Sequence, residues 1–96
     1  MTRHLHRHVV PVDDCQHEFT LTGGPLAVAA AADARSVEFW TEHDPEAGRA
    51  DRAFRVFGTG QPLPPEARWA GTCQRVRGLV WHLYEMPPGP ARGDAP

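Results

Sequence analysis

Three histidines near the N-terminus have the spacing of metal ligands on one strand: His4, His6 and His8. Alternate residues of a β-strand lie on one face about 6.6 Å apart, a separation at which two imidazoles can share one ion. Glu18 or His17 on a neighbouring strand would complete a zinc site of three ligands with one open position. The competing interpretation is the exposed polar face of an edge strand, with Leu5 and Val9 on the buried side.

The two cysteines offer weaker candidates for metal or thiol chemistry. Cys15 stands two residues before His17, so this pair could contribute to a metal site. Cys73 is predicted to lie on a closing hairpin, where His82 in some registers would face it and activate its thiol. The competing interpretation for each is a structural thiol, because buried unreactive cysteines are far more common. The spacing matches neither a zinc motif nor a disulfide framework.

Trp40 is the candidate for contact with a protein partner. In the alternating segment from residue 37 to 42, Trp40 points away from the predicted core, together with Glu38 and Glu42. An outward tryptophan between two acids is typical of an interface, because interfaces are enriched in aromatic residues. The sequence therefore predicts a partner-binding surface formed by these three residues.

Several classes of chemistry are excluded by residues that the chain lacks. It contains no lysine, so a Walker-type phosphate loop, a Schiff-base amine and a lysine base are all absent. Its one serine, Ser36, has no flanking glycines of a nucleophile elbow. The formal net charge of −2 gives no global positive field, which disfavours nucleic acid. A local arginine patch that includes Arg75 and Arg77 keeps nucleic-acid binding open as a second alternative.

The elements that position these residues are predicted to be short β-strands separated by turns. Pro11 at the end of the first segment suggests a sheet edge. The segment 26–32 is ambiguous between a strand and a short alanine-rich helix, and its alternation favours the strand. The predicted strands are 4–10, 17–22, 26–32, 37–42, 53–57, 68–74 and 79–85. About seven such strands predict an all-β chain, folded as a single small antiparallel sandwich or barrel.

The chain is expected to form one domain with a tail. Residues 1–86 carry the apolar pattern of a compact β-domain, and no apolar run approaches the length of a membrane span. Residues 87–96 are rich in proline and glycine, which predicts a disordered C-terminal tail. With no signal peptide apparent, the expected location is cytoplasmic.

Two motifs resemble those of a known family. The turn at residues 58–62 reads Gly-Thr-Gly-Gln-Pro, and residues 80–85 read Val-Trp-His-Leu-Tyr-Glu. These motifs look like those of small uncharacterised proteins of phages, prophages and actinobacteria that form a domain of unknown function. Members of that family often carry histidine where Gln61 stands, which puts any role of that histidine in doubt here. The resemblance implies a small accessory protein and implies no chemistry.

The function expected from the sequence is therefore non-enzymatic. The chain would bind a protein partner or itself, as a homodimer, and it would need no cofactor. The first alternative is a metal-binding β-domain that uses the three N-terminal histidines. The second is a nucleic-acid-binding protein.

Overall fold

The computed structural model describes residues 2–74 and 78–88, and within these residues every regular element is a β-strand. The strands are β1 (His4–Pro11), β2 (His17–Leu21), β3 (Ala27–Ala30), β4 (Ser36–His43), β5 (Ala50–Gly58), β6 (Arg68–Thr72) and β7 (Trp81–Met86). The described part therefore has no helix that could span a membrane. The predicted all-β class is confirmed.

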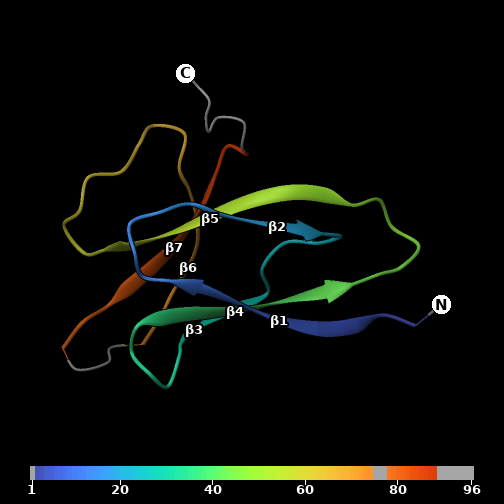
Figure 1. Ribbon diagram of the computed structural model, residues 1–96, viewed down its shortest axis with the longest axis horizontal. Helices are drawn as coiled ribbons and strands as arrows, with labels where there is room; N and C mark the ends of the chain where they lie inside the picture. The colour runs from blue at the N-terminus through green and yellow to red at the C-terminus, as the bar shows by residue number, and fades with distance from the viewer. Residues whose placement is uncertain (1, 75–77, 89–96) are drawn as a thin grey trace.

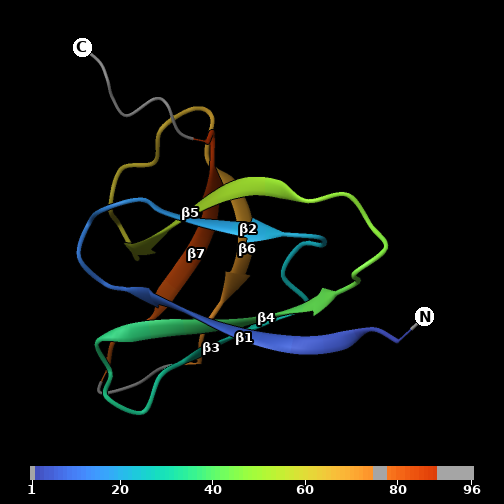
Figure 2. The same ribbon diagram turned by 45° about the vertical axis from the view of Figure 1, so that its right-hand side comes forward.

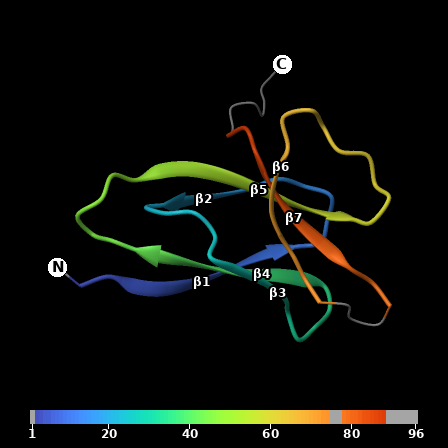
Figure 3. The same cartoon turned by 180° about the vertical axis from the view of Figure 1, so that it is seen from behind.

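The seven strands form two antiparallel sheets that face each other (Figures 1 and 2). One sheet has three strands in the order β1-β4-β3, and the other has four in the order β2-β5-β7-β6. The view from behind shows the same two layers, with β6 and β7 on the near side (Figure 3). The strand interpretation of the alanine-rich segment is confirmed, because Ala27–Ala30 pairs with β4. Pairing in the sheet outweighs the helix propensity of alanine there.

The core lies between the sheets and is built from alternate residues of each. Val10 and Phe39 project from the three-stranded sheet, and Phe54, Val56 and Leu83 project from the other. All five are at most 2% exposed. Burial of such side chains stabilises the fold by about 1.5–3 kcal/mol each.

The buried and exposed faces of β1 are the reverse of the expected ones, in which Leu5 and Val9 were buried. Leu5 is 68% exposed and Val9 41% exposed, whereas Val10 is fully buried opposite Val37. The apolar pair Val9 and Val10 leaves the phase of the alternation undecided in the sequence. In the structure Val10, and not Val9, packs in the core. A one-residue change of phase moves every side chain of a strand to the other face. The histidine face of β1 therefore turns inward.

A second, smaller core covers the outer face of the four-stranded sheet. Phe57, Ala53 and Met86 are buried there, with Ala67 and Tyr84 packed against them. The proline-rich connection from residue 59 to 67 folds over this face and contains no strand, as its prolines predict. Two expectations lie outside the described residues: the hairpin turn through Arg75 and Arg77, and the disordered tail beyond residue 88.

Candidate functional site

The outer face of the three-stranded sheet carries the predicted partner-binding residues. Trp40 is half-buried at its centre and pairs directly with Arg7 of β1. Glu38 accepts a hydrogen bond from Arg7 at 2.7 Å, and Glu42 accepts one from Arg3 at 2.8 Å. The sheet thus brings Glu38, Trp40 and Glu42 together on one face. Its two acids are already neutralised by arginines of the same face.

The neighbouring edge of β1 has free backbone groups. The Val12 amide donates to the Arg35 carbonyl at 2.9 Å, so the even-numbered residues of this segment direct their amides and carbonyls toward β4. The intervening residues direct theirs away from β4, and these are Leu5, Arg7, Val9 and Pro11. No described strand pairs with β1 on that side. Pro11, which has no N–H, belongs to the outward set, so the predicted sheet edge is confirmed.

The three N-terminal histidines share one face of β1 but have different neighbours. The His6 ring stacks on His43 of β4, with centroids 4.9 Å apart and planes 7° from parallel. The His8 Nε2 lies 2.9 Å from the Thr41 hydroxyl oxygen. Burial, and then the charge of nearby His6, lower the pKa of His8 below its ordinary value. His8 is therefore held toward its neutral form, while His4 is exposed at the start of the strand.

A metal site is not assembled within one copy of the described chain. Those residues contain no group of three or more histidine, cysteine, aspartate or glutamate side chains placed to hold an ion. The Cys15 thiol is exposed, and the His17 Nε2 instead lies 3.0 Å from each carboxylate oxygen of Asp13. Metal binding by His4, His6 and His8 therefore stays a prediction, which elemental analysis of untagged protein tests.

The predicted thiol pairing of Cys73 with His82 is wrong. Cys73 is buried in the core, and burial raises the pKa of its thiol to about 11. The residue opposite His82 in the pairing of β6 with β7 is Thr72. The bulge between Trp69 and Gly71 contributes to that register, and a glycine inside a strand is a sequence signal for such a bulge. Cys73 is a structural core residue.

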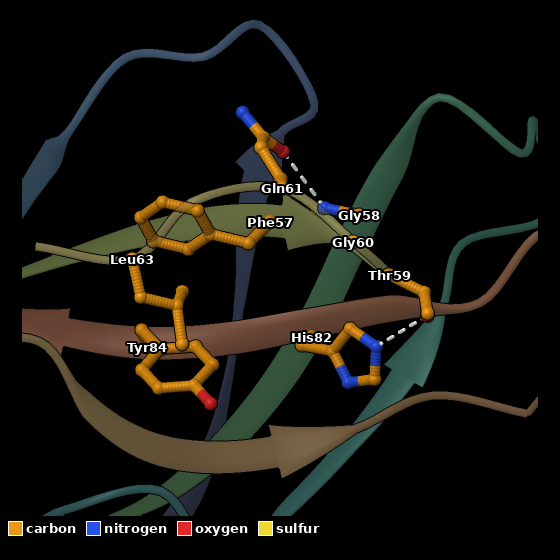
Figure 4. A pocket seen from close by; sticks show the side chains of 8 residues that line it. All are labelled: Phe57, Gly58, Thr59, Gly60, Gln61, Leu63, His82 and Tyr84. Carbon is orange, nitrogen blue, oxygen red and sulfur yellow. Dashed lines mark hydrogen bonds between the residues drawn. The ribbon is translucent and has the colours of Figure 1, made fainter.

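A pocket that sequence reasoning did not predict opens beside the turn that follows β5 (Figure 4). Its volume is about 170 Å³, and β5, the turn, the proline-rich connection and β7 all contribute to its lining. The lining residues are Phe57, Gly58, Thr59, Gly60, Gln61, Leu63, His82 and Tyr84. Gly60 has a φ of +92°, a conformation that favours glycine, so the predicted role of the glycines in this turn is confirmed at that position.

Gln61 holds this turn in place. Its Oε1 accepts a hydrogen bond from the Gly58 amide at 2.9 Å, and its Nε2 donates to Asp14 at 3.1 Å. Figure 4 shows the Gln61 amide directed toward Gly58 and away from His82. The Gln61 side chain therefore links this turn to the loop between β1 and β2. The Gly-Thr-Gly turn and His82 were both visible in the sequence, but no sequence pattern places the end of β5 beside the start of β7.

Comparison with known proteins identifies the family. Residues 1–93 match a family described as a domain of unknown function, DUF7352, and the chain belongs to it. No curated protein and no solved structure matches the chain.

Proposed function

We propose that this chain is a non-enzymatic interaction protein that forms a homodimer through the free edge of β1. The observation that carries the proposal is the edge itself. Eight residues long, it presents free amides and carbonyls and the exposed side chains of Leu5 and Val9. Proteins normally block such edges, because a free strand is a template for pairing with another chain. A second copy would extend the three-stranded sheet to six strands.

The sequence of β1 is suited to pairing with itself. Residues 5–9 read Leu-His-Arg-His-Val, a pattern that is close to symmetric about Arg7. In an antiparallel pair centred on Arg7, Leu5 lies opposite Val9 of the second copy, and the reverse pair follows by symmetry. Two copies in this register align apolar with apolar and histidine with histidine. The two central arginines would each remain paired with their own Glu38, which limits their mutual repulsion.

Charge supports a protein partner over nucleic acid. Arg3 and Arg7 on this face already form ion pairs with Glu42 and Glu38, so the face carries little free positive charge for a phosphate backbone. Arg75 and Arg77, the residues of the predicted nucleic-acid patch, lie outside the described part.

Light scattering coupled to gel filtration tests the dimer. The expected mass is twice the chain mass of 10.6 kDa at high concentration, falling toward the monomer on dilution. Leu5→Asp should shift the dilution midpoint at least about tenfold, because it would place a charge opposite the apolar Val9 of the second copy. Leu26→Asp is the matched control, since Leu26 is 62% exposed just before β3 at the opposite edge. Monomers at every concentration, or equal effects of the two variants, would refute the proposal.

We also propose that the chain is an accessory protein of phage or prophage type that works in the cytoplasm. Support for this comes from the Gly-Thr-Gly-x-Pro and Val-Trp-His-Leu-Tyr-Glu motifs, which resemble those of small phage and actinobacterial proteins. The genes beside its own test the proposal, because a cluster of phage genes supports it and a metabolic operon contradicts it.

A further inference from the structure

A chain of hydrogen bonds runs across the outer face of the four-stranded sheet and ends at the pocket. The Trp69 indole Nε1 donates to the Thr72 hydroxyl oxygen at 2.9 Å. That oxygen lies 2.9 Å from the His82 Nδ1, and the His82 Nε2 lies 2.8 Å from the Thr59 hydroxyl oxygen. Three elements, β6, β7 and the turn after β5, thus fix the position of one hydroxyl group at the pocket wall.

The direction of these bonds determines what Thr59 offers to a ligand. An indole N–H only donates, so the Thr72 oxygen accepts from Trp69. When His82 carries a proton on Nε2, in the neutral ring or in the imidazolium, that N–H donates to Thr59. The hydrogen of the Thr59 hydroxyl is then left for another acceptor. An acceptor in the pocket therefore pairs with a proton on Nε2 and disfavours the tautomer with a bare Nε2.

The other half of the pocket is apolar. The Phe57 and Tyr84 rings meet edge to face with centroids 5.5 Å apart, and Leu63, which is 46% exposed, lies beside them. Figure 4 shows these three side chains together on one side and the Thr59–His82 pair on the other. The volume of about 170 Å³ is close to that of an apolar cavity that holds benzene, about 150 Å³. The pocket therefore matches one ring or a short aliphatic group attached to one polar group.

The positively charged side chain of Arg55 lies near the apolar half of the pocket. The Arg55 guanidinium carbon lies 4.6 Å from the centroid of the Phe57 ring. Its nearest acid is Asp14, with 3.9 Å between the Arg55 Nη2 and the Asp14 Oδ1. Asp14 also accepts the hydrogen bond from Gln61. The cation of Arg55 is therefore only weakly compensated, which favours an anionic acceptor over a neutral one.

We propose that this pocket binds a small aromatic carboxylate. The ring would occupy the space between Phe57, Leu63 and Tyr84, and the carboxylate would accept the hydroxyl hydrogen of Thr59 beside His82. The pocket lies on the outer face of the four-stranded sheet, whereas β1 belongs to the three-stranded sheet. Ligand binding therefore does not depend on the dimer, and either proposal can fail without the other.

Titration with sodium benzoate, followed by two-dimensional ¹H–¹⁵N NMR, tests the proposal. Saturable shifts are expected at the Trp69 indole N–H and the Thr59 amide, with a dissociation constant in the millimolar range. Thr59→Val keeps the shape of the side chain and removes the donor. It should weaken binding about tenfold, because a hydrogen bond to a charged group contributes about 1.5–3 kcal/mol.

Two controls make the result decisive. Thr20→Val removes a hydroxyl that bonds Asp51 on β5, away from the pocket, and should leave benzoate binding unchanged. Benzyl alcohol, which has the ring without the carboxylate, should bind at least about tenfold more weakly than benzoate. The proposal is overturned if benzoate causes no saturable shifts, if Thr59→Val binds like the wild type, or if benzyl alcohol binds equally well.

Discussion

Replacing Gly71 by alanine would place a methyl group where the edges of the two sheets meet. Gly71 is buried in β6, and β3 packs against β6 at this point. A Cβ atom on Gly71 would lie 2.9 Å from the Val28 Cβ and closer still to the Val28 Cγ2. Carbon atoms do not approach each other this closely, so β3 and β6 must separate to accept the substitution.

The cost follows from that overlap. Overpacking in a well-packed interior costs about 1–3 kcal/mol of unfolding free energy, and we expect Gly71→Ala to fall in this range. Val28→Ala alone should cost about 1 kcal/mol, because it removes two methyl groups from a half-buried site. Together the two substitutions should cost less than their sum by about 1 kcal/mol, since Val28→Ala removes the atom that the new methyl group meets first.

Urea unfolding at equilibrium measures all the variants of this cycle. Gly48→Ala is the matched control, because a Cβ atom there meets nothing within 4 Å. It should change the unfolding free energy by less than about 0.5 kcal/mol. If Gly71→Ala is as stable as Gly48→Ala, or if the Gly71 and Val28 substitutions are additive, the sheets do not meet at Gly71 as described.

Three further predictions concern titratable groups. Cys15 should react with a thiol reagent in the native protein, whereas Cys73 should react only on unfolding, because it is buried and its pKa is raised to about 11. Mass spectrometry measures the labelling of each cysteine, and equal labelling of the two in the native protein would contradict this prediction. The pKa of His8 is lowered in the folded protein, so the unfolded chain takes up the proton first as the pH falls. The free energy of unfolding should therefore decline below about pH 6.5, the ordinary pKa of histidine. His8→Gln should remove part of that decline, as measured by urea unfolding at several pH values. Arg52 donates hydrogen bonds to both carboxylate oxygens of Glu85 and thereby lowers the pKa of Glu85. This pair therefore stabilises the fold at pH values above the ordinary pKa of glutamate, and the contribution is lost as acid protonates Glu85. Glu85→Gln should cost about 1–3 kcal/mol at neutral pH and much less near pH 2, and an equal cost at both pH values would argue against the ion pair.

Much of the fold could be predicted because alternation in a half-buried strand is a local signal. Val37, Phe39 and Thr41 alternate with outward residues, and the structure buries all three. In β1 the signal was ambiguous, because Val9 and Val10 are adjacent and either could belong to the core. Only the packing of Val10 opposite Val37 resolves that choice, and this is a tertiary contact.

The site was harder to predict because its parts are far apart in the sequence. Thr59 and His82 meet only in the observed pairing of β5 with β7, in which Gly58 lies opposite Trp81. Thr72 reaches the same histidine because a bulge shifts the register of β6. Sequence patterns indicate strands but not such registers. Glu38, Trp40 and Glu42 were placed correctly on one face because they lie on a single strand.

Disulfide trapping at Arg7 tests the proposed dimer most directly. In a pair centred on Arg7, the two Arg7 Cα atoms lie about 5.5 Å apart, within the range that a disulfide bridges. Arg7→Cys in a Cys15→Ser background should therefore form a covalent dimer on mild oxidation. Val9→Cys in the same background should not, because the two Val9 positions would be separated by about 13 Å along the paired strands. Efficient trapping at Val9, or none at Arg7, would contradict self-pairing of β1 in this register.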